Sequence, residues 1–381
     1  MKYRLEQIVD VTMGQSPKSI YYNSNGKGYP FLQGNKTFGL RYPVFDTYTE
    51  VMTKAAKAGD VIMSVRAPVG ELNITPVDMC LGRGVCSLRM KNGNQDFLYY
   101  MMKYYIPHLI NKESGTVFGS VSKKDISSLE VDIPEDVEIQ RKIARYLLMF
   151  DEKIELNEQI NKNLEQQAQA YFNKLFIVNA DPNWPECTLS DIGSVVAGGT
   201  PSKSKPEYYA AQGIAWITPK DLSVDKSKFI SHGENDISEL GFSKSNAKKM
   251  PAGTILFSSR APIGYIAIAQ NEITTNQGFK SVIPNENIGT AYVYFLLKNL
   301  LPTIEGMASG STFKEISGAG MKSVPTVMPD VDTIQFFSNF CEPIFKEQEL
   351  LEAENKHLSA LRDSLLPKLM SGELDVSDID I

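Results

Sequence analysis

The sequence is poor in the residues that build metal sites and disulfide frameworks. It has three histidines and four cysteines among 381 residues, and Cys80, Cys86, Cys187 and Cys341 show neither CxxC spacing nor a dense arrangement. We therefore expect free thiols, no metal and no disulfide. The chain also lacks both the run of about 18 apolar residues that a membrane span needs and an apolar leader. We expect no membrane contact and a cytoplasmic location.

Motifs of common active sites are missing as well. The run AGGTPSK (197–203) lacks P-loop spacing, and no serine stands in GxSxG. Residues 181–184 (DPNW) resemble the base-binding tetrapeptide of amino-methyltransferases, but without its second proline or a glycine-rich cofactor loop they favour a turn. The charges of 151–153 (DEK) point around a helix instead of toward one metal, which favours a solvated helix face. We predict no catalytic residue.

The chain has no excess of positive charge either. Its net charge is −6, which by itself argues against binding to nucleic acid. The charges are unevenly distributed, however: residues 330–381 hold 12 acidic and 4 basic residues, whereas residues 1–134 hold 12 acidic and 16 basic residues. The acidity belongs to the segments that we predict to be helical, so DNA binding is not excluded.

The sequence does contain an internal repeat. Three pairs of segments match: AGDVIMSVRAPVGELNI (58–74) with AGTILFSSRAPIGYIAI (252–268), LEQIVDVTMGQSP from Leu5 with LSDIGSVVAGGTP from Leu189, and SGTVFGSVSKKDI from Ser114 with SGSTFKEISGAGM from Ser309. Arg66 and Arg260 correspond at an offset of 194 residues. A period this long indicates a duplicated domain instead of a solenoid. We predict similar domains at 1–134 and 180–329, with two similar sites.

Each predicted domain is followed by a helix signature. Pro134 and Pro329 precede carboxylates, which suits a helix N-terminus. Seam positions then follow the 4-3 alternation of a coiled coil. We predict spacer helices at 135–179 and 330–381 that pair antiparallel, because the first must end where the second domain begins. The seam residues chosen are Leu147, Phe150, Ile154, Asn161, Leu164, Leu351, Asn355 and Leu358.

Two features of these helices carry further expectations. We interpret Asn161 and Asn355 as polar seam residues that fix the register of pairing. Pro343 predicts a kink or a late start of the second helix, and Pro367 a distorted last turn. The alternative is that each helix packs its apolar stripe only on its own domain.

The repeated SVRAPVG and SSRAPIG segments place Arg66 and Arg260 at a strand end before a turn. A guanidinium group can bind a DNA phosphate or a guanine base. If the two domains recognise different sequences, an arginine that both share is better suited to a phosphate contact than to a base contact. A structural arginine that ties a loop to a carboxylate remains an alternative. Base reading should fall in the segments that differ between the copies. The candidates there are Asn35, Lys36, Arg41, Lys220, Lys244 and Asn246, and Lys123, Lys124 and Lys314 are further phosphate candidates.

In this order, the motifs resemble the specificity subunits of type I restriction-modification systems over essentially the whole chain. The shared features are the L-x-x-I opening before a Gly-x-[ST]-Pro turn, S-x-R-A-P-x-G in both halves, IPEDVEIQRKI, and the closing LLPKLMSGELDV. The resemblance implies an α+β fold. Two similar α/β target-recognition domains would be joined by two long antiparallel coiled-coil helices, with an internal pseudo-twofold repeat.

The resemblance also implies a non-catalytic subunit that reads a bipartite site in double-stranded DNA, with the helices setting the unread spacer. The implied partners are two modification subunits, which bind S-adenosylmethionine and methylate adenine, and a restriction subunit. No cofactor is expected on this chain. Two other functions stay open: a scaffold or regulatory protein that binds proteins through its repeats, and the specificity module of a modification-only enzyme.

Overall fold

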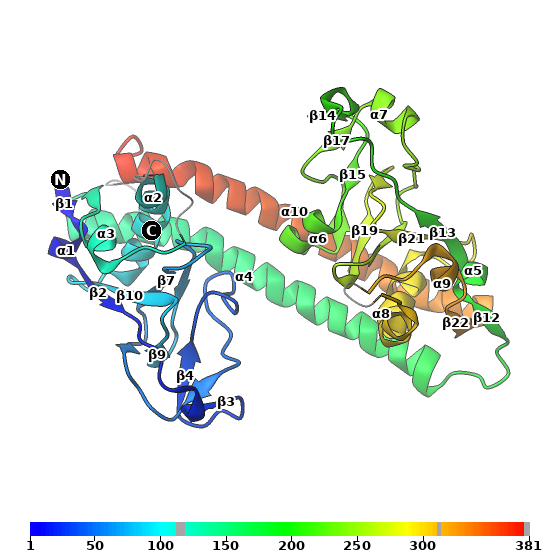
Figure 1. Ribbon diagram of the computed structural model, residues 1–381, viewed down its shortest axis with the longest axis horizontal. Coiled ribbons are helices and arrows are strands. Elements are labelled where there is room, and N and C mark those ends of the chain that lie inside the picture. Colours follow the sequence, from blue (N-terminus) through cyan, green and yellow to red (C-terminus); the bar gives the residue numbers. More distant parts are fainter. Residues whose placement is uncertain (112–118, 311–313, 377–381) are drawn as a thin grey trace. The chain divides into compact units, whose positions relative to one another are not determined.

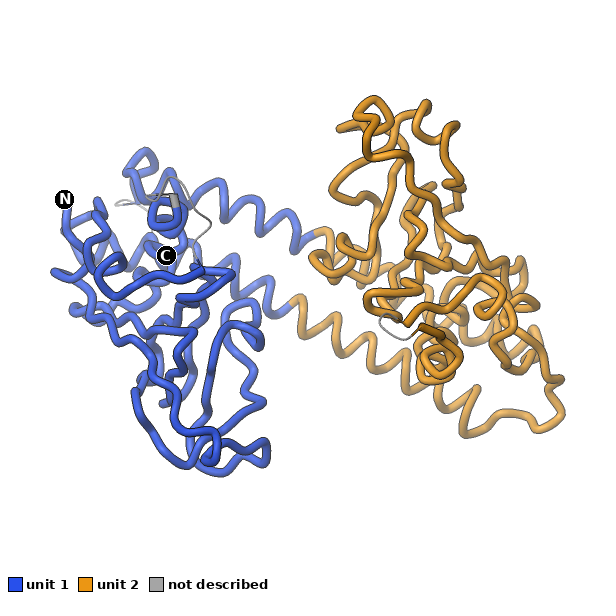
Figure 2. The backbone as a smooth tube through the Cα atoms, viewed as in Figure 1, with its two compact units in different colours: residues 1–156, 354–381 blue, residues 157–353 orange. Residues whose placement is uncertain are grey.

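The structure, a computed structural model, describes residues 1–111, 119–310 and 314–376 (Figure 1). It divides into two compact units, residues 1–156 with 354–381, and residues 157–353 (Figure 2). Each unit contains one globular domain and one stretch of each of the two long helices, α4 (Val137–Asn173) and α10 (Val331–Ser371). Within the described ranges, no helix is long and apolar enough to cross a membrane.

The first globular domain is built on an antiparallel sheet of buried apolar strands. Its order is β2 (Val9–Met13), β10 (Val85–Met90), β7 (Val61–Ser64) and β8 (Leu72–Ile74). A second sheet has the order β3 (Tyr22–Asn23), β5 (Tyr48–Thr49), β4 (Tyr29–Leu32), β9 (Met79–Leu81) and β6 (Ala55–Ala56), and β1 (Lys2–Arg4) pairs with β11 (Glu130–Asp132). The helices are α1 (Leu5–Ile8), α2 (Gln95–Asn111) and α3 (Lys123–Ser127), with a short 3-10 turn at Ser19–Tyr21.

The second globular domain repeats this plan. Its main sheet has the order β13 (Gly193–Ala197), β21 (Lys280–Pro284), β18 (Ile255–Ser259), β19 (Ile263–Ala269) and β16 (Phe229–Ile230). The smaller pairs are β12 (Glu186–Thr188) with β22 (Pro325–Val327), β14 (Tyr209–Ala210) with β17 (Asp236–Ile237), and β15 (Trp216–Ile217) with β20 (Thr274–Thr275). The helices are α5 (Leu189–Ile192), α6 (Pro219–Val224), α7 (Glu239–Ser243), α8 (Thr290–Met307) and α9 (Gly318–Lys322), with a 3-10 turn at Pro206–Tyr208.

The strand register confirms that one domain has been duplicated. Met13 pairs with Cys86 between β2 and β10, and Ala197 pairs with Lys280 between β13 and β21. These partners are related by the same offsets, 184 and 194 residues, that relate the matching sequence segments. Each sheet therefore uses equivalent residues in equivalent places, and the α+β fold with an internal repeat is confirmed.

Helices α4 and α10 run antiparallel to each other within each unit. In the first unit, Lys153 Nζ lies 3.4 Å from Glu354 Oε2, and in the second Gln348 Nε2 donates to the carbonyl oxygen of Asn161 at 3.2 Å. The first unit also pairs Asp151 with Arg362, and in the second the ring of Phe172 contacts that of Phe337. Within each unit, residues further along α4 therefore contact residues earlier in α10. All of the seam residues chosen from the sequence are buried or half-buried, although Asn161 contacts Gln348 through its backbone and not through its side chain.

Both long helices also belong to the cores of both globular domains. Leu147 of α4 and Leu369 of α10 lie in the first core, whereas Phe172 of α4 and Phe337 of α10 lie in the second. The alternative that each helix packs only on its own domain is therefore wrong. A π-helical segment, Lys174–Val178, ends the first helix and adds Phe176 to the second core.

Two details of these helices differ from expectation. The late start suggested by Pro343 is wrong, because α10 begins at Val331 and runs through that proline and through Pro367. The interpretation of residues 151–153 as a solvated face is wrong for Asp151, which is 2% exposed. Its carboxylate is paired with Arg362 of α10, a heptad position, and this partner offsets the cost of burying the charge.

Candidate nucleic-acid interface

The two repeated arginines lie in the same backbone setting. Arg66 follows β7 and forms a bridge with Ser120, and Arg260 follows β18 and forms the equivalent bridge with Glu315. In both repeats a cis Ala–Pro peptide follows the arginine. The sequence therefore placed both arginines correctly at a strand end, where they are held against the segment that follows a long domain helix.

The side-chain surroundings of the two arginines differ. Arg66 is exposed, and within the described part of the chain no ion pair involves it. Arg260 is half-buried, with Nη1 at 3.4 Å from Oε2 of Glu315, and Lys280 Nζ lies 3.6 Å from the other oxygen of that carboxylate. Arg260 thus makes the contact expected of a structural arginine that ties a loop to a carboxylate. The exposed side chain of Arg66 is available to a ligand.

Most of the other candidate residues lie on the surface of their domains. The exposed ones are Lys36, Lys123, Lys124, Lys220, Lys244, Asn246 and Lys314. Lys220 forms an ion pair with Glu234 at 2.6 Å, and half-buried Asn35 donates to Glu71 at 2.7 Å. Parts of the two predicted phosphate-binding loops, residues 114–118 and 311–313, lie outside the described residues.

Arg41, a base-reading candidate, is inside the first domain. Its side chain is 4% exposed, Nη2 lies 2.5 Å from Asp96 Oδ1, and Nη1 donates to the hydroxyl of Tyr100 at 3.5 Å. A guanidinium that is buried and paired with a carboxylate cannot reach a base edge without breaking the domain. The structure therefore corrects this prediction, and Arg41 is a core residue.

The backbone shows what Arg41 corresponds to in the second repeat. Ile74 N donates to the carbonyl oxygen of Arg41 at 2.8 Å, and Ile268 N, 194 residues later, donates to that of Lys228 at 2.7 Å. Arg41 and Lys228 are thus equivalent buried cations. Sequence reasoning missed Lys228 because it lies in a segment where the offset between the repeats changes.

Lys228 lies in an aromatic and polar environment where its domain meets the long helices. Its Nζ lies 2.8 Å from Glu165 of α4 and 2.9 Å from Gln348 of α10, and 3.5 Å from the ring centre of Phe345. Burial lowers the pKa of Lys228 to about 8, although Glu165 acts in the opposite direction. Burial raises the pKa of Glu165, but attraction by Lys228 and Lys298 outweighs this and lowers it overall.

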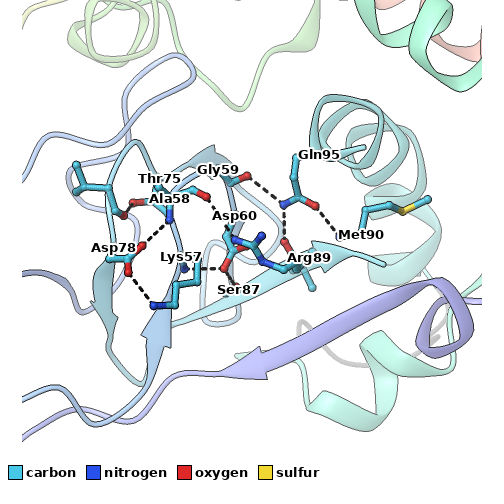
Figure 3. Close-up of polar contacts among 12 residues, drawn as sticks. Lys57, Ala58, Gly59, Asp60, Thr75, Asp78, Ser87, Arg89, Met90 and Gln95 are labelled. Atoms are coloured by element: carbon cyan, nitrogen blue, oxygen red, sulfur yellow. Dashed lines mark hydrogen bonds and ion pairs between the residues drawn. The ribbon is translucent and has the colours of Figure 1, made fainter. Parts of the chain in front are cut away.

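A polar network in the first domain has a structural role (Figure 3). Asp60 is 3% exposed and forms an ion pair with Arg89 at 2.5 Å. Its carboxylate also accepts hydrogen bonds from the Ser87 hydroxyl at 2.7 Å and from the Lys57 backbone N–H at 2.8 Å. Lys57 Nζ also binds Asp78 at 2.8 Å, and this hydrogen bond lowers the pKa of Asp78. These carboxylates are occupied in fixing the turn before β7, so they offer no acid or base for catalysis.

Chemistry of other kinds finds little support in the part of the chain that the structure describes. There, no three histidine, cysteine, aspartate or glutamate side chains gather where they could hold a metal ion. The four cysteines are free thiols. Burial raises the pKa of the Cys86 and Cys341 thiols to about 12, which makes neither a reactive nucleophile.

Two copies of one α+β domain, each packed on an antiparallel helix pair and each with basic side chains on its surface, define a tandem-domain recognition protein. The family model described as "Type I restriction modification DNA specificity domain" matches residues 1–166 and 182–357, and the chain therefore belongs to this family. Its members carry a DNA-recognition domain and not a catalytic one. The resemblance found from the sequence motifs is thus confirmed.

Two relatives and a solved structure show the extent of the similarity. The HindI specificity subunit of Haemophilus influenzae is 26% identical over 84% of this chain and 88% of that protein. The MjaIX specificity subunit of Methanocaldococcus jannaschii is 37% identical over 48% of this chain, and the match spans only 44% of the relative's length. The crystal structure of a type I S subunit from M. genitalium has the same fold, with a TM-score of 0.58 and 20% identity over 97% of this chain and 95% of that one.

Proposed function

We propose that this chain is the DNA-recognition subunit of a type I restriction-modification complex, and that each globular domain reads one part of a bipartite site in double-stranded DNA. The observation that carries the proposal is that the specificity-domain family matches both repeats. Each repeat also has its own arginine at an equivalent strand end. In this proposal residues 1–134 and 180–329 are the readers, and the segments between and after them are spacers.

Phosphate contacts are proposed for the arginine that the two readers share and for the lysines of the SGTVFGSVSKK and SGSTFKEIS segments. Base contacts are proposed for candidates in the segments that differ between the readers. Arg66, Lys123, Lys124, Arg260 and Lys314 would bind phosphates, and Asn35, Lys36, Lys220, Lys244 and Asn246 would face base edges. Phosphate contacts position a reader without carrying sequence information, whereas contacts to base edges specify the sequence.

The long helices are proposed to set the length of the unread spacer. Helix α4 has 37 residues, which corresponds to a rise of about 56 Å at about 1.5 Å per residue. The seam residues, which are buried or half-buried, would hold α4 and α10 in register.

The proposed partners are two modification subunits and a restriction subunit. Pseudo-twofold repetition would give two equivalent docking surfaces, one for each modification subunit. Those subunits would bind S-adenosylmethionine and methylate adenine, and this chain would bind no cofactor itself. We place the complex in the cytoplasm, where chromosomal DNA is accessible to it.

A gel-shift series with and without the modification subunit encoded beside this chain tests the proposal. The chain alone should bind DNA weakly and without sequence preference, and the complex should bind one sequence tightly with a marked dependence on salt. Methyl transfer or DNA cleavage by the isolated chain would contradict the non-catalytic role.

A further inference from the structure

Lys280 is a nearly buried cation that the sequence motifs do not reveal. It begins β21, is 8% exposed, and lies next to Arg260 at the end of β18. Its Nζ is 3.4 Å from the Ser259 hydroxyl, 3.4 Å from the Gln277 carbonyl oxygen and 3.6 Å from Oε1 of Glu315. All three contacts are long for an ammonium group, which usually approaches a carboxylate to about 2.7–2.9 Å.

Arg260 and Lys280 share one carboxylate. Glu315 lies 3.4 Å from Arg260 Nη1 through one oxygen and 3.6 Å from Lys280 Nζ through the other. The cluster therefore has one positive charge in excess. Because the Glu315 side chain is 37% exposed and its contacts are long, another anion with two or more oxygens can take its place without rearrangement of the sheet.

The first domain shows that the fold does not require this cluster. The equivalents of Lys280 and Glu315 there are Cys86 and Ser120, in the same strand register. At these two equivalent positions, the first domain therefore has neither the second cation nor the carboxylate. At these positions the charged pair is present in the second domain only, which separates its role from that of the shared arginine.

We propose that Arg260 and Lys280 form a phosphodiester-binding site in the second domain, and that the carboxylate of Glu315 occupies this site until a DNA phosphate displaces it. The inference deepens the proposed function, on which it rests, because DNA is the source of the phosphodiester. Two oxygens of the phosphate replace the two carboxylate oxygens, and the Glu315 side chain moves into solvent. Glu315 thereby weakens the grip of the second domain on arbitrary DNA.

The test measures binding of the full chain to a labelled duplex of about 30 base pairs with arbitrary sequence, by fluorescence anisotropy across a series of salt concentrations. Glu315→Gln removes the competing charge and keeps the shape of the side chain. We expect it to tighten binding about three- to tenfold and to steepen the salt dependence. The matched control is Glu272→Gln, which removes the carboxylate of the Lys249–Glu272 ion pair in the same domain and changes the net charge equally. We expect that control to change affinity less than twofold.

Lys280→Met removes one of the two cations of the proposed site, whereas Glu315→Gln removes the anion that competes with phosphate. Lys280→Met keeps the aliphatic stem in the core and should weaken binding and reduce the salt dependence, because the phosphate then contacts Arg260 alone. Circular dichroism shows whether each variant is folded. If Lys280→Met does not fold, the binding result for Glu315→Gln tests the inference by itself.

The contrary results are distinct. If Glu315→Gln lowers the melting temperature but binds DNA no more tightly than Glu272→Gln, then Glu315 only anchors the loop and the inference is wrong. If the wild-type chain binds no DNA, even with its modification subunit, then the proposed function fails together with the inference. If wild type binds and Lys280→Met binds equally well, only the inference fails.

Discussion

Tyr100 and Tyr294 occupy equivalent positions in the two repeats, and the hydroxyl of each donates a hydrogen bond to an acidic side chain of α4. Tyr100 binds Asp151 at 2.6 Å, and Tyr294 binds Glu165 at 3.2 Å. The cations that complete the two networks come from different places: Arg362 of α10 in the first unit and Lys228 of the globular domain in the second. Each junction between a domain and the helices therefore has its own arrangement of buried charges.

Breaking the buried pair in the first unit should destabilise that unit strongly. Arg362→Ala leaves the Asp151 carboxylate, which is 2% exposed, without its cation. We expect a loss of about 3–5 kcal/mol in the free energy of unfolding, measured by urea denaturation. Replacing both residues, in Asp151→Leu/Arg362→Leu, should cost less than the sum of the two single changes. A single-variant loss below about 0.5 kcal/mol would show that the pair is not buried as described.

Lys228 should make stability depend on pH in the alkaline range. Its pKa is about 8 in the folded chain and 10.5 when unperturbed, so between these values the unfolded chain binds more protons than the folded one. Unfolding then becomes less favourable as pH rises, by up to about 3 kcal/mol over this interval. Urea denaturation of wild type and Lys228→Met from pH 7 to 10.5 measures the effect. Wild type should gain stability relative to the variant, and parallel profiles would contradict the assignment.

Arg41 and Lys36 should separate stability from DNA binding. Arg41→Gln removes a buried cation from Asp96 and should lower the free energy of unfolding by about 2–4 kcal/mol. Lys36→Ala alters an exposed side chain, so stability should change by less than about 0.5 kcal/mol while affinity for the recognised site falls. Thermal denaturation and titration with DNA give the two readouts. Normal stability of Arg41→Gln together with altered sequence preference would restore Arg41 as a base reader.

Arg66 should act as a phosphate contact of the first domain. Arg66→Ala should weaken binding to all DNA sequences by a similar factor and reduce the salt slope by about 1. The control is Lys153→Ala, which removes an equal charge from α4, where Lys153 pairs with Glu354. Anisotropy titrations of both variants at several salt concentrations provide the comparison. A loss confined to one DNA sequence would instead make Arg66 a base contact.

The sequence was informative where structure repeats with a fixed period. The 4-3 alternation predicted the faces of α4 and α10 that are buried, because a helix returns to the same face at this spacing. The duplicated strand motif located β7 and β18 together with the arginines that follow them. Both the heptad spacing and the repeated strand motif are patterns of residues close together in the sequence. They can therefore be recognised without knowing which residues from distant segments pack against them.

The errors concern residues whose partners are distant in the sequence. Asp151 resembles a surface residue until Arg362, 211 positions later, is found beside it. Arg41 resembles a surface cation because its equivalence with Lys228 appears only in the backbone pairing. The cluster of Lys280, Arg260 and Glu315 has no local pattern, since three separate segments form it. A single sequence does not reveal such long-range pairing of charges.

The central claim is that two similar domains on this chain read two separate parts of one DNA site. Single-molecule sequencing of DNA methylation tests it directly, in cells that carry this chain with the neighbouring modification subunit. The expected result is a methylated adenine motif made of two specified parts with an unspecified gap of constant length, lost when this chain is deleted. A single contiguous motif, or methylation that is unchanged without the chain, would contradict the account.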